Sequence, residues 1–172
     1  MLDATPASLG HHACVTFFSA SDRTEWAAPA SPIDVGSGVI CCPSNYQNMP
    51  AQLEPVVRAT HLANASAWLA LEGDAYSAEK KRGNQLSLEA VERRIGKFAA
   101  HVKYIDSFTP RTVKHYTSKE NGAIYGSPHK LKTGATDLSN LFLIGTDQGL
   151  AGIVGAMLSG INMANAYGGV RD

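Results

Sequence analysis

The chain has 172 residues, a length that fits one domain with enough chain to bury a sizeable core. Its 44% of apolar and 17% of charged residues exclude a disordered chain, and its net charge of +0 argues against an electrostatic nucleic-acid binder. Three cysteines without C-x-x-C spacing predict neither a disulfide framework nor a metal site, so we interpret them as small apolar strand residues: Cys14, Cys41 and Cys42.

The sequence gives no sign of a targeting or membrane-spanning segment. A basic stretch followed by an apolar core is missing at the amino terminus, so no signal peptide is expected. No stretch reaches the ~20 apolar residues needed to cross a bilayer. A cytoplasmic setting is the default expectation. Peripheral membrane contact by the apolar last helix stays open as an alternative, although polar residues stand at or within its ends: Asp147, Gln148, Asn162 and Asn165.

Three strands are expected in the first third of the chain. Residues 12–19 are rich in β-branched and aromatic side chains, and residues 35–42 form an apolar run whose glycines indicate a bulge or a close neighbour. Residues 53–60 give the third strand, which Pro55 places at an edge or shifts at its start. Together these runs predict an antiparallel sheet.

Helices are expected in the middle of the chain. Residues 63–71 have a helical composition, and residues 77–102 carry apolar side chains at steps of three and four, which is typical of an amphipathic helix. Gly83 and Gly96 are weak points that can divide this helix. Its basic side chains are interpreted as a solvated face rather than a binding patch: Lys80, Lys81, Arg82, Arg93, Arg94 and Lys97.

A strand and a short helix are expected around Pro110. Residues 104–109 have the composition of a strand that the proline ends. Residues 111–116 predict a short helix, because proline suits a first helical turn. His115 and Tyr116 are candidates for proton transfer, and a purely structural role is the commoner alternative.

Turn and loop signals follow. Asn121-Gly122 indicates a turn, residues 123–126 a strand or a loop, and residues 128–140 a polar loop.

The last part of the chain predicts a strand, a glycine turn and a helix. Residues 141–144 are four apolar residues, which suits a buried strand. The turn contains Gly145, Thr146, Asp147 and Gly149. The helix should run over residues 152–166, with a stripe of small residues that allows close packing on a sheet: Gly152, Ala156, Gly160 and Ala164. Such a unit can hold an anion or a dipole at the helix N-terminus, and tight packing alone is the alternative interpretation.

Two motifs carry a resemblance to a known family. The later one resembles the C-terminal FAD-contacting motif of the phytoene desaturase-like flavoproteins, which include carotenoid desaturases, carotenoid isomerases and retinol saturases: Gly145-x-Asp147, Gly152-x-x-Gly155-Ala156 and Ser159-Gly160. The earlier one is similar to the segment that precedes it in that family: Thr109-Pro110, Tyr116-Thr117 and Gly122-Ala123-Ile124-Tyr125-Gly126. The G-x-D spacing agrees with the retinol saturase-like members. The family's opening G-x-G-x-x-G is absent from these 172 residues.

The resemblance implies a fold and a cofactor site. It implies the C-terminal portion of a two-domain FAD-binding protein of mixed α/β class. Residues 1–136 would belong to the substrate domain, including the helical region 77–102, and residues 137–172 would form the last strand, turn and helix of the FAD domain. The helix N-terminus would face the flavin pyrimidine edge and favour negative charge there. The implied FAD-contacting residues are Gly145, Thr146, Asp147, Gly152, Ile153, Val154 and Gly155.

The resemblance also implies an activity. The parent protein would be an FAD-dependent oxidoreductase acting on carbon–carbon bonds of a polyene or another apolar substrate. In such a protein residues 53–60 would form either a wall of the substrate cavity or plain sheet. Because the ADP-binding unit is missing, the chain alone is expected to be inactive, to bind FAD weakly or not at all, and to need an N-terminal half as partner. The alternative is a non-enzymatic interaction module without a cofactor.

Overall fold

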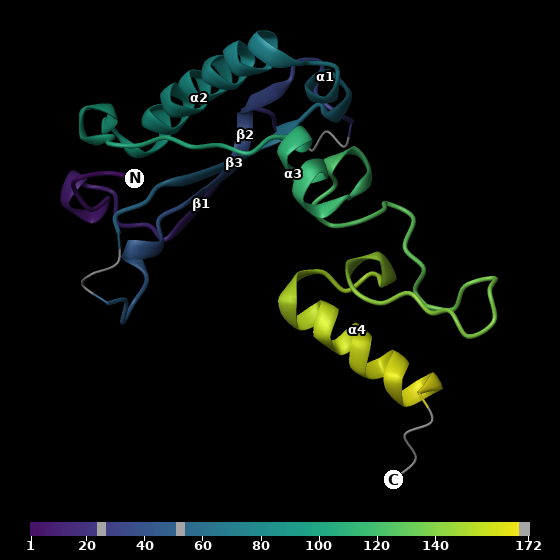
Figure 1. Cartoon of the computed structure of the whole chain (residues 1–172). Coiled ribbons are helices and arrows are strands. Elements are labelled where there is room, and N and C mark those ends of the chain that lie inside the picture. Colours follow the sequence, from purple (N-terminus) through teal and green to yellow (C-terminus); the bar gives the residue numbers. More distant parts are fainter. Residues whose placement is uncertain (24–26, 51–53, 169–172) are drawn as a thin grey trace.

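The computed structural model describes residues 1–23, 27–50 and 54–168, and its class is mixed α and β, as predicted (Figure 1). Within these residues a three-stranded antiparallel sheet is accompanied by four α-helices. The strands are β1 (Val15–Phe18), β2 (Ile33–Cys41) and β3 (Arg58–Ala63), and the helices are α1 (Ala65–Leu69), α2 (Gly73–Ile95), α3 (Pro110–Thr117) and α4 (Gly152–Tyr167).

The sheet has the order β1-β2-β3, with β2 in the centre. Both features predicted from its glycines are confirmed: the β2–β3 register shifts between Asp34 and Val39, and a β-carbon on Gly38 would overlap the Thr60 carbonyl oxygen. β3 lies at an edge and starts three residues after Pro55, so the predicted third strand is displaced toward the carboxyl end. Residue 53, its predicted start, lies outside the described residues.

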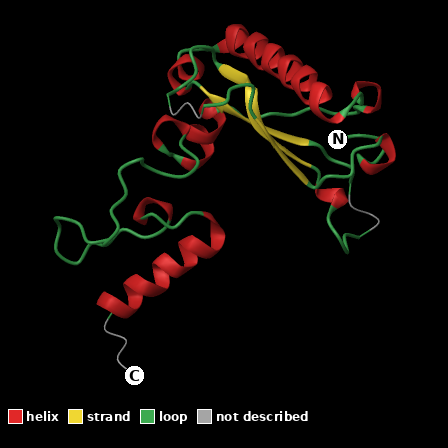
Figure 2. Cartoon of the chain, turned by 180° about the vertical axis from the view of Figure 1, so that it is seen from behind, coloured by secondary structure: helices red, strands yellow, loops and turns green. Residues whose placement is uncertain are grey.

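Helix α2 covers one face of the sheet and supplies the core (Figure 2). The buried cluster joins β2, the residue after it, α2, the turn after α2 and the N-terminal segment: Leu2, Ile40, Cys42, Val91 and Phe98. The buried Cys42 thiol has its pKa raised to about 11, mainly by desolvation, which agrees with an apolar packing role. The opposite face of the sheet carries exposed Val15, Phe17 and Leu62.

One of the two predicted weak points ends α2, and the other does not interrupt it. Gly96 takes a φ of +94° directly after the helix, so the predicted continuation to residue 102 is wrong. Gly83 stays inside the helix, where it is buried and faces the Trp68 indole of α1, 3.9 Å from the ideal β-carbon position. Trp68 in turn donates its indole N–H to the Pro32 carbonyl oxygen at 2.8 Å.

The carboxylate of Glu92 organises the chain after α2. This side chain is 7% exposed and accepts the backbone N–H groups of Phe98 and Ala99 at 2.9 and 2.8 Å. Lys97 Nζ lies 2.9 Å from its other oxygen. These three donors lower its pKa to about 2, with the lysine contact first and the two N–H groups next. Glu92 therefore works as an internal acceptor for the turn that follows the helix.

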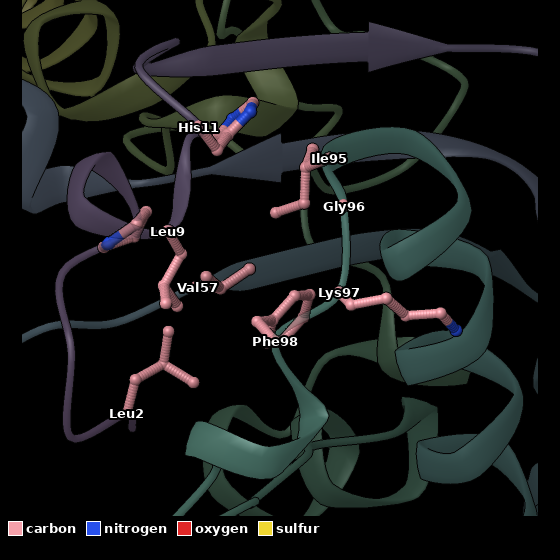
Figure 3. Close-up of a pocket in the computed structure, with 9 residues that line it drawn as sticks. Leu2, Leu9, His11, Val57, Ile95, Gly96, Lys97 and Phe98 are labelled. Atoms are coloured by element: carbon pink, nitrogen blue, oxygen red, sulfur yellow. The ribbon is translucent and has the colours of Figure 1, made fainter.

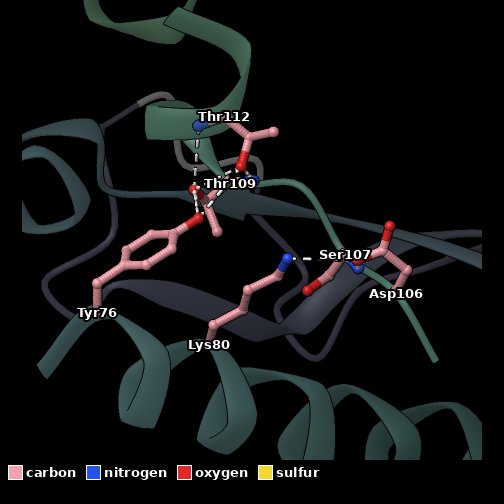
Figure 4. A network of polar contacts seen from close by, with 6 residues as sticks. All are labelled: Tyr76, Lys80, Asp106, Ser107, Thr109 and Thr112. Atoms are coloured by element: carbon pink, nitrogen blue, oxygen red, sulfur yellow. Dashed lines mark hydrogen bonds and ion pairs between the residues drawn. The ribbon is translucent and has the colours of Figure 1, made fainter. Parts of the chain in front are cut away.

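The predicted strand at residues 104–109 is wrong, because residues 103–109 pair with no other strand in the described chain. Its first residues bond to the Met1 backbone, and the rest of the segment is held by side chains (Figure 4). Lys80 Nζ lies 3.3 Å from Asp106 Oδ1, and the Tyr76 hydroxyl lies 3.1 Å from the Thr109 hydroxyl. Thr109 then caps α3 with Thr112 in a capping box, which confirms the short helix predicted after Pro110.

The last part of the chain folds beside the sheet rather than in it. Figure 1 shows α4 apart from β1–β3, reached through a long extended segment after α3. The predicted strand at residues 141–144 is wrong for this chain, since its one bridge joins Phe142 to Ala135. Leu141 and Ile144 are 51% and 56% exposed. The final helix is confirmed. No helix among the described residues is both long enough and apolar enough to span a bilayer.

Candidate functional site

The turn before α4 has the glycine geometry that its sequence predicts. Gly145 and Gly149 flank a 3-10 turn over Thr146–Gln148 with φ values of +89° and +117°. Gly152 opens α4 with a φ of +79°. All three conformations are in the range that favours glycine.

The N-terminus of α4 is uncapped and uncovered. The residue before the helix, Ala151, offers no side-chain cap, and no atom lies within 4 Å of an ideal β-carbon at Gly145 or Gly152. The first backbone N–H groups of a helix have no intrahelical acceptor, and the helix dipole is positive at this end. The start of α4 therefore combines free donors with room for a ligand.

The side chains at this end of α4 point outward. Ile153 and Val154 are 83% and 69% exposed. Gly155 is tightly packed, because a β-carbon there would lie 2.7 Å from the Leu150 carbonyl carbon. The predicted stripe of small residues is not the most buried face of α4. Its buried residues are Ser159 and Met163, whereas Ala156 and Gly160 of the stripe are half-buried.

Asp147, a predicted cofactor residue, has both carboxylate oxygens engaged within the protein. Its Oδ1 accepts the backbone N–H of Ser127 at 2.5 Å, and its Oδ2 lies 3.0 Å from Lys119 Nζ. These contacts lower the pKa of Asp147, the Ser127 N–H first and the Lys119 ammonium second. A β-carbon on Gly126 would overlap Oδ1. The two sequence motifs thus meet at Gly126 and Asp147.

The rest of the turn is tied to the same segment. Lys130 places its ammonium against two backbone carbonyls, those of Tyr125 and Thr146, the latter at 3.0 Å. The Leu131 N–H donates to the Asp147 carbonyl at 3.0 Å. The sequence did not single out Lys119, Ser127 or Lys130, and no local pattern indicates them.

A buried serine connects the turn to the body of α4. The Ser159 side chain is fully buried and accepts the Gly145 N–H at 2.7 Å. Its hydroxyl donates to the Gln148 amide oxygen, and the Gln148 amide nitrogen lies 3.1 Å from the Met163 sulfur. Ser159 belongs to the Ser-Gly pair of the later motif, so its place in the sequence carried a signal for this contact.

The earlier motif is also joined by contacts. Gly122, at a φ of +66°, rests so closely on Pro110 that a β-carbon would overlap the proline backbone. This contact folds the turn at Asn121-Gly122 back onto the start of α3. His115 and Tyr116 stack edge to face at 4.8 Å on exposed positions of α3. Neither side chain forms a hydrogen bond or an ion pair with an ionisable group among the described residues, and their catalytic role stays a prediction.

A small apolar hollow lies elsewhere in the molecule (Figure 3). It is lined by the N-terminal segment, the residue before β3 and the end of α2, including Leu2, Leu9, His11, Val57, Ile95 and Phe98. Partial burial lowers the pKa of His11 there, with the neighbouring His12 as the second cause. In the described chain no three His, Cys, Asp or Glu side chains gather closely enough to hold a metal ion. The hollow shares no residue with the turn before α4.

Comparison with known proteins gives one partial likeness. The chain is 34% identical over 80 residues to the all-trans-retinol 13,14-reductase of Danio rerio. The match covers 41% of the present chain and 13% of the reductase, so the chain spans a small part of that relative's length. No protein-family model matches the chain, and no solved structure matches it. These findings support a distant, partial relationship to a retinol saturase-type protein.

Proposed function

We propose that the chain is the C-terminal portion of an FAD-dependent oxidoreductase acting on carbon–carbon bonds of a polyene or another apolar substrate. The partial likeness to a retinol reductase carries this proposal, because it points to the same class of chemistry as the two motifs. The order of the two motifs supports the wider link to phytoene desaturase-like enzymes. FAD, when bound, would supply the redox chemistry, and the protein would position it.

The residues at the start of α4 fit a flavin ring. The open backbone at Gly145 and Gly152 leaves space for a planar group, and the uncapped N–H groups of Gly152, Ile153 and Val154 can donate to it. The positive end of the helix would stabilise negative charge on the ring edge that faces it. Thr146 and Asp147 form the turn between these two open points. Residues 137–172 are proposed as the part of an FAD domain that carries this contact.

A partner containing the ADP-binding unit completes this proposal. An N-terminal half of the same enzyme would hold the ADP end of FAD and cover the exposed apolar residues of the last part of the chain. The purified chain alone should then show little bound flavin in its visible absorbance spectrum, even after FAD is added and removed by desalting. Stoichiometric flavin that survives desalting would contradict the need for a partner.

A non-enzymatic interaction module is the second candidate. It is favoured by the large apolar side chains that α4 leaves exposed, including Ile153, Val154, Met157 and Ile161. A helix that is apolar on several sides normally packs against other protein. Failure of the chain to respond to flavin under any condition, together with stable association with another protein chain, would favour this candidate over the enzyme.

Gly152→Ala tests the flavin site. We expect the unfolding free energy to fall by about 1–2 kcal/mol from the left-handed backbone, because nothing nearby would be overpacked. We also expect a weaker flavin response, because the methyl group would occupy the open space. Gly73→Ala is the matched control, since Gly73 opens α2 at a φ of +50° with nothing within 4 Å. Both variants should lose similar stability by chemical denaturation. If Gly152→Ala and Gly73→Ala respond equally to flavin, Gly152 is not part of the flavin site.

A further inference from the structure

The carboxylate of Asp147 makes contacts that hold the turn before α4 in place. Both of its oxygens are satisfied by donors 20 and 28 residues away in the chain, the Ser127 N–H and the Lys119 ammonium. Its side chain is 21% exposed, and Gly126 lies against it so closely that only a hydrogen fits. Each oxygen therefore already accepts one hydrogen bond from residues 119–127, so the carboxylate is directed toward that segment.

The turn has contacts on two sides. On one side, Asp147 and the Thr146 carbonyl attach it to residues 119–131 through Lys119, Ser127, Lys130 and Leu131. On the other side, the Gly145 N–H attaches it to the buried Ser159 of α4. A shift of the turn would therefore change the position of the open backbone at Gly145 relative to the first N–H groups of α4.

We infer that Asp147 is a positioning residue for the proposed flavin site and not a flavin ligand. With Gly126 and Lys119 it forms a clamp, the Asp147 clamp, that fixes the turn against residues 119–131 and so sets the spacing between Gly145 and the N-terminus of α4. This inference rests on the proposed function. It assigns the Gly-Ala-x-Tyr-Gly motif a purpose: its last glycine leaves room for the carboxylate of the later motif.

A double-mutant cycle tests the clamp without flavin. Gly126→Ala, Asp147→Ala and the double variant are compared in the 172-residue chain by hydrogen exchange of the amides in residues 119–131 and 144–156. Each single variant should raise local opening. The double variant should open at least about fivefold less than the product of the two single effects, because removing the carboxylate removes the atom that the new methyl group overlaps.

Gly126→Ala combined with Asp106→Ala is the control pair. Asp106 is also paired with a lysine, Lys80, but it has no contact with Gly126, so this pair should be multiplicative. If the effects of Gly126→Ala and Asp147→Ala on local opening also multiply, the two residues are not coupled. That result would contradict the Asp147 clamp. If Asp147→Ala alone leaves the chain too open to measure, Asp147→Ser replaces it, since its shorter side chain also lacks the oxygen that a methyl group on Gly126 would overlap.

The flavin arm uses FMN and amide NMR shifts at residues 152–155. Asp147→Ala and Gly126→Ala should weaken the FMN response by a similar factor, and Asp147→Asn should restore most of it. If the FMN response is lost in both Asp147→Ala and Asp147→Asn but is unchanged in Gly126→Ala, then Asp147 contacts the flavin directly. That result would overturn the inference. If hydrogen exchange shows coupling between Gly126→Ala and Asp147→Ala but FMN shifts no amide signals, the proposed function is wrong. The Asp147 clamp then remains as a feature of the fold.

Discussion

Gly122→Ala is expected to lower the unfolding free energy by about 2–5 kcal/mol, from a left-handed backbone and a collision with backbone atoms. The ideal β-carbon would overlap the Pro110 carbonyl oxygen and lie 2.6 Å from its α-carbon. Neither atom belongs to a flexible side chain, so the collision can be relieved only by moving the backbone at the start of α3 or in the turn that carries Gly122. Chemical denaturation monitored by circular dichroism measures the loss.

Gly96→Ala separates the two causes. Gly96 has a φ of +94° and no atom within 4 Å of an ideal β-carbon, so alanine there meets backbone strain without a collision. Its loss should be about 1–3 kcal/mol. If Gly122→Ala costs no more than Gly96→Ala, then the contact between the two halves of the earlier motif contributes nothing to stability.

Acidification is expected to remove the stabilising contribution of Glu92. The pKa of its carboxyl is lowered from 4.5 to about 2 in the folded chain, so the folded state favours the charged form. Its contribution is complete above the unfolded value near 4.5 and disappears as the pH falls toward 2. Glu92→Ala should cost about 1–3 kcal/mol at neutral pH, because it leaves the buried Phe98 N–H without an acceptor. Melting temperatures measured from neutral pH to pH 2.5 test both statements.

Glu92→Gln is the control for the titration. Its amide oxygen can still accept the Phe98 and Ala99 N–H groups, but it does not titrate and cannot pair with Lys97. Its melting temperature should therefore fall less steeply than that of the wild type between pH 4.5 and 2.5. Other carboxyls also have a lowered pKa, including those of Asp3, Asp106 and Asp147. They contribute equally to the pH dependence of the wild type and of Glu92→Gln, so the difference between the two curves reports on Glu92. Parallel curves would show that Glu92 does not carry the effect.

The elements that the sequence predicted correctly have local causes. The proline that predicted α3 lies in its first turn, and Gly96 ends α2 because its positive-φ backbone cannot continue the helix. The glycines of β2 mark a real register shift beside β3. Each of these features is decided by residues within a few positions of one another, so it is readable without the fold.

The incorrect predictions depend on distant partners. Residues 104–109 and 141–144 have the composition of strands, but a strand forms only where another strand offers its edge, and composition does not reveal that edge. The candidate site divides in the same way. The open turn at Gly145 and the start of α4 at Gly152 follow from glycine spacing. Lys119 and Ser127, which hold the turn, lie too far away in the sequence to be predicted from it.

An amide NMR titration of the chain with FMN tests the proposed flavin site most directly, and ADP serves as the parallel ligand. High ligand concentrations make weak binding visible. We expect FMN to shift the amide signals of Gly145 and of residues 152–155. ADP should not shift them, because no G-x-G-x-x-G motif occurs in these 172 residues. An unchanged spectrum with FMN, or shifts confined to residues outside the turn and the start of α4, would contradict the proposed flavin site.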